Sequence, residues 1–256
     1  MSNLAAFIRK EVTEHIRSGK ITILVVIFII LGIMNPAIAK LTPWLLETMA
    51  DTLAESGMTV TEVTVSALDS WVQFFKNLPM GLIAFILFES NSFSKEYQSG
   101  TLVLSLTKGL KRHTVVTAKA IVISTLWSAL CWLSFGITYA YNAYFWDNGI
   151  AQSLLFSVVC GWLIGVFAVA LAVFFSTVAK SNTGVLMGIG TIFVLSYILS
   201  VIPKLNEYLP TRLLDGNSLI YGKSSPKDYA AALILTLAVI VVSFIASIPI
   251  FNKKQL

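Results

Sequence analysis

The sequence predicts an all-α membrane protein with six transmembrane helices, and three observations predict this fold class. Hydrophobic residues make up 56% of the 256 residues and charged residues only 12%, whereas soluble domains are about half apolar and a quarter charged. The mean hydropathy is +0.81. Apolar runs near the roughly 20 residues needed to cross a hydrocarbon core recur along the whole chain. Such spans are expected to be helical, because a helix satisfies its own backbone polar groups in lipid.

The hydropathy pattern places the six expected spans at residues 21–39, 78–93, 115–145, 154–178, 184–202 and 229–251. Two longer polar insertions, residues 40–77 and 203–228, are expected on one side of the membrane. No segment is long or polar enough for a separate soluble domain. Residues 1–256 are therefore expected to form a single transmembrane domain.

Residues 1–20 are expected to form an amphipathic helix that lies in the membrane interface. Its apolar residues recur every four positions, at Leu4, Ile8, Val12 and Ile16, with charged residues on the other faces. A merely solvated helix is the alternative. The run that follows, with Ala37 and Ala39 near its end, resembles a signal sequence with a cleavage site, but the acidic residues before it favour a retained span.

The distribution of Lys and Arg predicts the orientation. With six spans both termini share one side, and that side then carries twelve of the eighteen positive charges. Because positive residues are enriched in cytoplasmic segments, both termini are expected in the cytoplasm. The pI of about 9.2 then reflects membrane topology, and nucleic acid is not an expected partner.

The cytoplasmic segment of residues 94–114 contains a short amphipathic pattern. Leu102, Val103, Leu106 and Leu110 fall on one helical face, and Gly100 precedes them. Basic residues gather at the end of the pattern, where cations complement a helix C-terminus: Lys108, Lys111 and Arg112. We expect a short helix parallel to the membrane, which either packs on the protein's own spans or docks onto a cytoplasmic partner.

This segment resembles the cytoplasmic loop of permease subunits of type-2 ATP-binding-cassette (ABC) exporters. In that family a glutamate is followed by Gly-Thr-Leu, a leucine-rich short helix, a basic residue and a lysine that enters the third span. The corresponding residues here are Glu96, Gly100, Thr101, Leu102, Leu106, Arg112 and Lys119. The family often has a proline before the basic residue, and this chain has "LTKGLKR" instead. The interfacial helix, the six spans and the large external loops extend the resemblance over essentially the full length.

The resemblance implies that residues 94–114 form a coupling helix, which fits a groove on a separate cytoplasmic ABC ATPase. Two permease copies, identical or related, would pair with two ATPases. The residues expected to make the coupling contact are Glu96, Gly100, Thr101, Leu102, Leu106, Leu110 and Arg112. The chain has no phosphate-binding Gly-x-x-x-x-Gly-Lys-Ser/Thr motif, so ATP and magnesium are expected on the partner ATPase and no cofactor on this chain.

Glu89 is the only carboxylate inside an expected span. Intramembrane acids are costly to insert and therefore suggest a function. Glu89 lies near the cytoplasmic end of its span, where it could meet water or pair with Lys95 or Arg112. A structural or gating ion pair and a substrate or proton site are both open.

Small residues predict close helix packing in two spans. Gly161 and Gly165 are four apart in the fourth span, and Gly184 and Gly188 repeat this spacing in the fifth. The spacing does not say which contacts lie within the chain. The resemblance favours the fifth span, together with the first, as the seam between two permease copies.

The external loops are expected to cover the outer mouth of the transport path. Thr42 and Pro43 predict a new helix start after the first span, and residues 66–76 a second short helix. In the last loop, Leu205, Tyr208 and Leu209 lie between two prolines and are expected to form an apolar lid. The family has a re-entrant pair of short helices there, and a simple exposed loop is the alternative.

Enzyme chemistry is poorly supported, because the two histidines and two cysteines show no metal-ligand spacing and no nucleophile is paired with an evident base. We therefore expect an export permease for a hydrophobic or amphipathic cargo, such as a peptide, a lipid-like molecule, a drug or a toxin. A secondary transporter or channel is the alternative, and would need several polar groups at the bilayer midplane. The absence of glycosylation sequons fits a bacterial plasma membrane.

Overall fold

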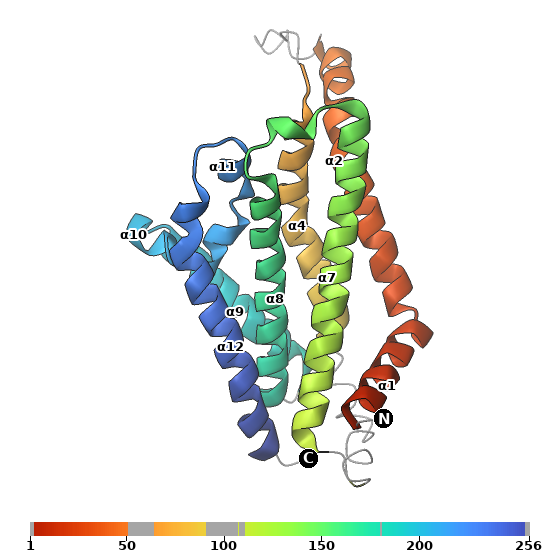
Figure 1. Cartoon of the computed structure of the whole chain (residues 1–256), viewed down its shortest axis with the longest axis vertical. Coiled ribbons are helices and arrows are strands. Elements are labelled where there is room, and N and C mark those ends of the chain that lie inside the picture. Colours follow the sequence, from red (N-terminus) through yellow and green to blue (C-terminus); the bar gives the residue numbers. More distant parts are fainter. Residues whose placement is uncertain (1–2, 51–63, 91–106, 108–110, 180, 254–256) are drawn as a thin grey trace.

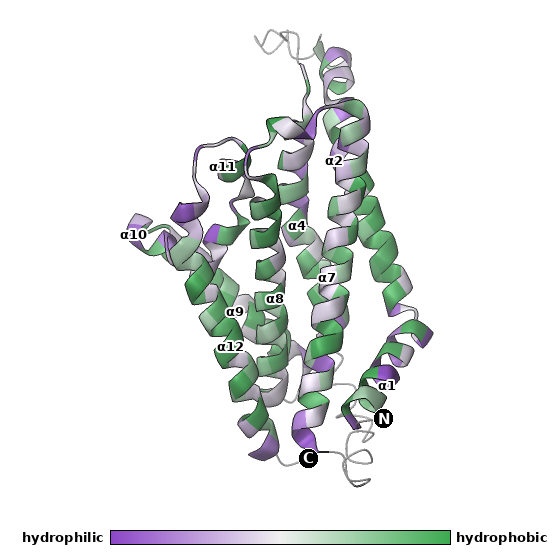
Figure 2. Ribbon diagram, viewed as in Figure 1, coloured by the Kyte–Doolittle hydropathy of each residue, from purple (hydrophilic) through white to green (hydrophobic). Residues whose placement is uncertain are grey.

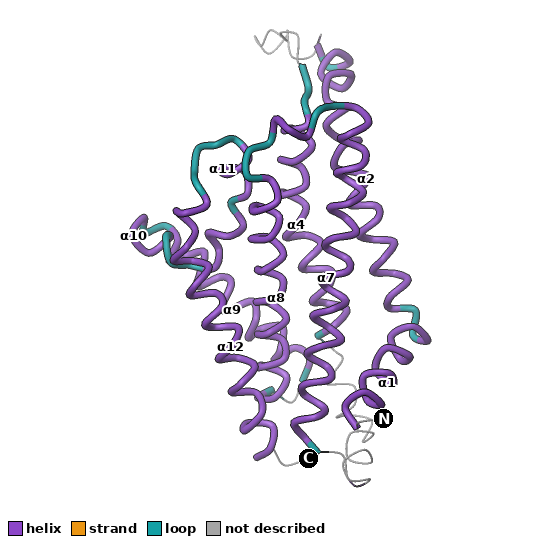
Figure 3. Tube along the Cα trace, in the orientation of Figure 1, coloured by secondary structure: helices purple, strands orange, loops and turns teal. Residues whose placement is uncertain are grey.

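The computed structural model describes residues 3–50, 64–90, 107, 111–179 and 181–253. In this part of the chain, helices joined by turns and loops account for every described segment, as Figure 3 shows. The helices long and apolar enough to cross a membrane are α2 (Lys20–Thr48), α4 (Ala67–Glu89), α7 (Arg112–Phe145), α8 (Leu154–Val178), α9 (Asn182–Ser200) and α12 (Ala230–Lys253). The all-helical, six-span fold class is therefore confirmed.

The long helices form a bundle around α8 (Figure 1). Helices α4, α7, α9 and α12 all pack against α8, while α2 packs on the outer side of α4 and α7. A further helix, α1 (Asn3–Arg17), slants beside the lower part of α7 at the lower right of Figure 1. Figure 2 shows mostly apolar residues along the middle of the bundle and more polar residues toward its two ends, as expected for a bilayer-spanning protein.

Trp127 of α7 fixes the centre of the bundle. Its side chain is fully buried and its indole Nε1 donates a hydrogen bond to the backbone oxygen of Trp162 in α8, at 2.9 Å. Phe28 and Phe85 pack against the ring, with centroid separations of 5.9 and 5.4 Å. One aromatic side chain thus joins α2, α4, α7 and α8.

A second buried contact is polar and joins three helices. Asn77 of α4 donates to Asn35 of α2 at 2.8 Å. Asn35 in turn donates to the hydroxyl of Thr138 in α7 at 3.0 Å, and that hydroxyl donates to the backbone oxygen of Gly32. Because these groups satisfy one another, they can lie inside the bundle without the cost of unpaired polar atoms.

The helices on both sides of the first expected insertion, residues 40–77, extend into it. Helix α2 continues through Pro43 to Thr48, and the hydroxyl of Thr42 bonds back to Ile38 O within that helix rather than capping a new one. The helix continues past Lys40, whose ammonium group lies 3.5 Å from the ring centroid of Phe145. Residues 66–76 are not a separate helix but the Ser66 cap and first turns of α4.

The start of α4 follows from its capping chemistry. The backbone N–H of Ser66 donates to the Asp69 carboxylate at 2.8 Å, and these two residues form a capping box. The segment between α2 and α4 therefore runs from Met49 to Ser66 and is shorter than the expected 40–77. The polar residue Asn77 belongs to the span because Asn35 supplies its partner.

The last insertion folds into short helical elements that return to the bundle. They are α10 (Pro203–Asn206), η2 (Pro210–Leu214), α11 (Gly216–Ile220) and η3 (Pro226–Tyr229), while the connection before α8 contains η1 (Asn148–Ile150). Helix α11 packs against α4 and α8, and η2 packs against α8, α9 and α12. Helix α10 projects outward at the end of α9 (Figure 1).

Candidate functional site

A sharp turn brings helix α1 back onto the bundle. Gly19, between α1 and α2, has φ of +73°, a left-handed conformation that glycine adopts without the cost a side chain brings. The turn directs one face of α1 against α7 and α2. Its buried residues are Phe7, Glu11 and His15, spaced four apart. The ionisable residues Glu11 and His15 of α1 therefore face the bundle.

Glu11 forms an ion pair with Lys119 of α7. The Lys119 Nζ lies 2.8 Å from Glu11 Oε2, and both side chains are 2% exposed. The other carboxylate oxygen, Oε1, accepts from Lys10 at 3.0 Å. A charge that costs several kcal/mol to bury alone is here matched by an opposite charge with good geometry. This pair holds α1 to the first part of α7.

His15 joins α1 to the end of α4. Its Nδ1 lies 2.9 Å from the backbone oxygen of Glu11 and must carry hydrogen, because a carbonyl only accepts. Its Nε2 lies 2.9 Å from Oε2 of Glu89. One proton must therefore lie between these two atoms, either on the imidazole or on the carboxyl group. We call Glu11, His15, Glu89 and Lys119 the charge cluster.

The environment of His15 favours the imidazolium form. Burial lowers the pKa of His15, but the hydrogen bond from the ring to Glu89 and the charge of that carboxylate outweigh burial and raise the pKa above its ordinary value of 6.5. With His15 protonated, the charge cluster contains two positive and two negative groups. Oε1 of Glu89 has no hydrogen-bond partner among the described residues, so this carboxylate is the least satisfied member.

The charge cluster lies where α4 ends and α7 begins, at the two ends of the segment that connects these helices. Glu89 is the last residue of α4, and Lys119 lies seven residues after the start of α7 at Arg112. Residues 90–111 connect these two helices. Because Glu11 and His15 are one turn apart on α1, this helix binds α4 and α7 at once. The charge cluster therefore connects α1, the end of α4 and the first part of α7.

Among the described residues, His15 is the partner of Glu89, and the expected partner Arg112 is not. The side chain of Glu89 is 1% exposed and so does not line an open, wet mouth. Arg112 instead donates from Nη1 to the backbone oxygens of Phe251 and Asn252, both at 3.0 Å. Lys95 lies outside the described residues, as do the coupling residues Glu96, Gly100, Thr101, Leu102, Leu106 and Leu110.

Sequence reasoning missed Glu11 and His15, because it followed the apolar positions of α1. Val12 and Ile16 do lie outward, with exposed fractions of 38% and 60%, which suits contact with lipid. The overlooked signal is the spacing of Phe7, Glu11 and His15, which places two ionisable groups on one face. In the described part of the chain, no group of three or more His, Cys, Asp or Glu side chains could hold a metal ion.

The four expected packing glycines contact residues of their own chain. A Cβ atom at Gly161 would overlap Leu78, and one at Gly165 would overlap the indole of Trp127. At Gly188 it would lie 2.5 Å from Phe175 Cδ1, and at Gly184 it would lie 3.0 Å from Ala179 Cβ. Close packing is thus explained within one chain at these positions. The face of α9 that carries Gly190 is different, since a Cβ there would meet no atom within 4 Å.

The expected lid residues lie at α10 and the turn that follows it. Leu205 and Tyr208 are 42% and 55% exposed, so neighbouring elements of the chain do not cover them. The following element is buried instead at Pro210, Thr211 and Leu213. Within one chain, Leu205 and Tyr208 thus leave apolar surface uncovered beside the end of α9.

An apolar groove runs between α4 and α9. It has a volume of about 480 Å³ and is lined almost entirely by apolar side chains, including Leu82, Ile86, Ile189 and Phe193, with Tyr197 toward one end. Gly190 forms part of its wall. The groove offers no fixed charge, so it suits an apolar occupant.

Comparison with known proteins adds one match. A family model described as "ABC-2 family transporter protein" matches residues 5–256, which is nearly the whole chain. A search of curated proteins found no match.

Proposed function

The chain belongs to the ABC-2 family of transporter permeases, and from this premise we propose that it is the membrane subunit of an exporter driven by separate cytoplasmic ATPase subunits. The family match carries this proposal. The expected cargo is hydrophobic or amphipathic, because the apolar groove between α4 and α9 contains no charged side chain. ATP and magnesium would bind to the partner ATPase.

We propose that residues 94–114 are the coupling segment that contacts the ATPase. The charge cluster supports this role, because it binds both helices from which the segment emerges. A push on the segment would then move α4 and α7 as a unit with α1, rather than bend one helix alone. Helices transmit such displacements because they are rigid along their axes.

Two permease copies are proposed to assemble through α9. Only 17% of the apolar stretch of α9 is buried within the chain, and the groove between α4 and α9 opens beside it. A second copy would cover this exposed surface and enclose the groove as a cargo path. Residues 205–209 at α10 would then close the external mouth.

The charge distribution supports an orientation with both termini in the cytoplasm. The start of α1, the start of α7 and the end of α12 lie at the same end of the bundle (Figure 1). This end carries most of the positive residues, which the positive-inside rule assigns to the cytoplasm. A bacterial plasma membrane is the proposed location.

The coupling proposal is tested by replacing Leu102 and Leu106 with Asp. The double variant should insert normally but fail to co-purify with the ATPase, because charges replace the apolar docking face. The matched control is Leu41→Asp together with Leu45→Asp near the external end of α2, where both side chains are exposed. Normal ATPase binding and transport in the Leu102/Leu106 variant would contradict the proposal.

A second experiment tests transmission through the charge cluster. Glu89→Gln keeps the side-chain shape but removes the charge that faces His15. ATPase binding should persist, while ATP hydrolysis and transport should become less tightly coupled. The readout is the number of cargo molecules moved per ATP in vesicles, and an unchanged ratio from pH 6 to 9 would show that Glu89 has no part in coupling.

The same vesicles distinguish the alternative, a secondary transporter or channel. Export by the proposed complex requires ATP hydrolysis and stops when the partner ATPase is inactivated. A proton or sodium gradient without ATP should not drive cargo movement. Gradient-driven movement by the permease alone would favour the alternative.

A further inference from the structure

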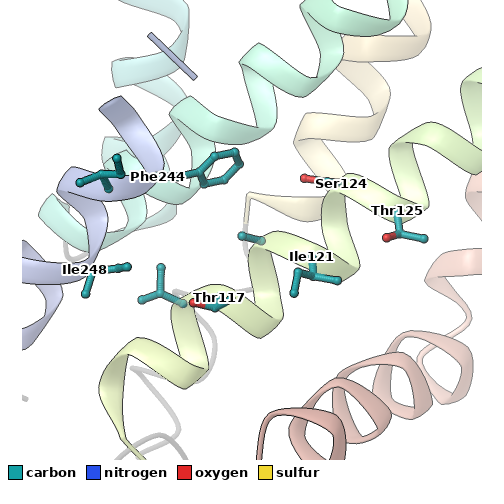
Figure 4. A pocket seen from close by; sticks show the side chains of 9 residues that line it. Thr117, Ile121, Ser124, Thr125, Phe244 and Ile248 are labelled. Atoms are coloured by element: carbon teal, nitrogen blue, oxygen red, sulfur yellow. The ribbon is translucent and has the colours of Figure 1, made fainter. Parts of the chain in front are cut away.

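A second groove lies between α7 and α12. It has a volume of about 460 Å³ and is lined by nine residues, all apolar except for three hydroxyl side chains. Figure 4 shows Phe244 and Ile248 of α12 facing Thr117, Ile121 and Ser124 of α7 across it. Ile121 and Ile245 at its rim are 41% and 64% exposed. The groove is therefore open to the side of the bundle, where lipid lies.

The depth of the groove matches a lipid acyl chain. Its α7 lining runs from Val116 to Thr125, beginning four residues after the helix start at Arg112. At about 1.5 Å per residue, this places the groove about 6 to 20 Å from that end of α7. The hydrocarbon of one leaflet is about 15 Å thick. The groove therefore spans the depth of acyl chains in a single leaflet.

The end of the groove nearest the chain termini is strongly basic. Lys111 precedes α7, Arg112 begins it and Lys253 ends α12. Neither helix contains an Asp or Glu residue, since no acid occurs from Thr101 to Trp146 or from Tyr229 to Leu256. Arg112 bonds the backbone oxygens of Phe251 and Asn252, so its guanidinium lies where the two helix ends meet. An apolar groove with cations at its mouth is complementary to an anionic amphiphile.

The groove between α4 and α9 provides an internal comparison. Its volume is similar, about 480 Å³, and it is also open at the side. However, α4, which forms one of its walls, ends at Glu89, whose carboxylate is buried against His15, so α4 supplies no exposed cation there. Of these two grooves, the one between α7 and α12 is the one whose two wall helices, in the described part of the chain, carry exposed basic residues at their ends and no Asp or Glu.

We propose that the groove between α7 and α12 binds an anionic phospholipid of the cytoplasmic leaflet. One acyl chain would lie between Ile121 and Phe244, and the phosphate would lie near Lys111, Arg112 and Lys253. The leaflet assignment rests on the orientation given under Proposed function. Such a lipid would join α12 to the first turns of α7, which emerge directly from the proposed coupling segment.

The test measures lipid retention by the purified permease without any ATPase, so that its outcome is independent of the coupling proposal. Phosphatidylglycerol and phosphatidylcholine with identical acyl chains are added in equal amounts, and bound lipid is counted by native mass spectrometry. Two or three cations near a membrane surface predict a preference of about tenfold or more for phosphatidylglycerol.

Two variants separate the headgroup from the acyl chain. Lys111→Gln with Lys253→Gln, both at exposed positions, should remove the preference for phosphatidylglycerol without disturbing the fold. Ala120→Phe should fill the groove and reduce retention of that lipid. The matched control is Ala129→Phe, at an exposed position of the same helix outside the groove lining, which should retain lipid as the unchanged protein does.

The outcomes are decisive in both directions. Equal retention of the two lipids by the unchanged protein would overturn the proposal. So would a preference that survives the lysine substitutions, or retention that is the same in Ala120→Phe and Ala129→Phe. Loss of preference in the first variant and loss of retention in the second would establish the site.

Discussion

Helices α8 and α9 look alike in sequence but occupy different places in the bundle. Both are apolar, and each carries two glycines four residues apart: Gly161 and Gly165 in α8, Gly184 and Gly188 in α9. Yet 72% of the apolar stretch of α8 is buried within the chain, against 17% for α9. The difference shows that a glycine pair indicates a close contact but not how much of its helix is covered.

The two helices differ in burial because their glycines contact different parts of the bundle. Gly165 leaves room for the indole of Trp127 at the centre of the bundle, whereas Gly188 leaves room for Phe175 near the end of α8. Helix α9 thus touches the bundle along a narrow strip and keeps most of its surface free. The comparison predicts that substitutions in α8 will damage the fold of the single chain, whereas substitutions on the free face of α9 will not.

The largest effect is expected for Gly165→Ala. The new methyl group would overlap the ring of Trp127, which is fully buried and hydrogen-bonded to Trp162 O, so it cannot move aside. The free energy of unfolding should fall by more than about 3 kcal/mol, above the usual range for overpacking. Thermal unfolding in detergent measures this change. Gly136→Ala, where a Cβ would meet no atom within 4 Å, is the control and should not destabilise the chain.

A smaller loss is expected for Gly188→Leu. A Cβ atom there would lie 2.5 Å from Phe175 Cδ1, but Phe175 is only partly buried and its ring can shift. We expect the free energy of unfolding to fall by about 2 kcal/mol, within the usual range for overpacking. If Gly188→Leu proved as damaging as Gly165→Ala, the contrast between the two helices would be wrong.

Ser181→Ala should weaken the start of α9 without affecting α8. The Ser181 hydroxyl accepts a hydrogen bond from the backbone N–H of Gly184 at 3.2 Å, as an N-cap. Loss of such a cap costs about 1 kcal/mol. Hydrogen exchange of the first turn of α9 should become faster, while exchange in the buried middle of α8 stays the same. Equal acceleration in both helices would mean that α9 is more tightly coupled to the core than its burial indicates.

The smallest effect on the single chain is expected for Gly190→Leu. No atom lies within 4 Å of a Cβ at this position, and Leu has a better helix propensity than Gly, so the free energy of unfolding should not fall. If α9 forms the proposed seam between two copies, however, the variant should shift the protein from dimer to monomer. Light scattering on detergent-solubilised protein tests this. An unchanged dimer would place the seam elsewhere.

The pH dependence of stability tests how the charge cluster holds α1 to the bundle. Because the pKa of His15 is raised in the folded protein, its contribution to stability is fully present below about pH 6.5 and is lost as pH rises through the folded-state pKa. The melting temperature of the unchanged protein should therefore fall over this range. His15→Gln should fall less, and equal slopes for the two proteins would show that His15 does not contribute.

The candidate site was only partly predictable. Glu89 was recognised from the sequence because a carboxylate in an apolar run is rare, but its partner was not, since His15 is 74 residues away along the chain. The coupling residues rest on a sequence resemblance and, apart from Arg112, lie outside the described residues. The bounds of α8 were predicted correctly, whereas α2 and α4 extend further than expected. Their polar residues Lys40 and Asn77 find partners in neighbouring helices that no local pattern reveals.

The sequence by itself determined that the protein is a six-span helical bundle, because the length and composition of each apolar run are local properties that suffice for a membrane helix. The tertiary structure alone decided which helix is central, which glycines are covered and which charges meet. Lipid is about as apolar as the inside of the bundle, so hydropathy does not distinguish a buried face from a lipid-facing one. That distinction depends on side chains from distant parts of the chain, such as Trp127 with Gly165 and His15 with Glu89.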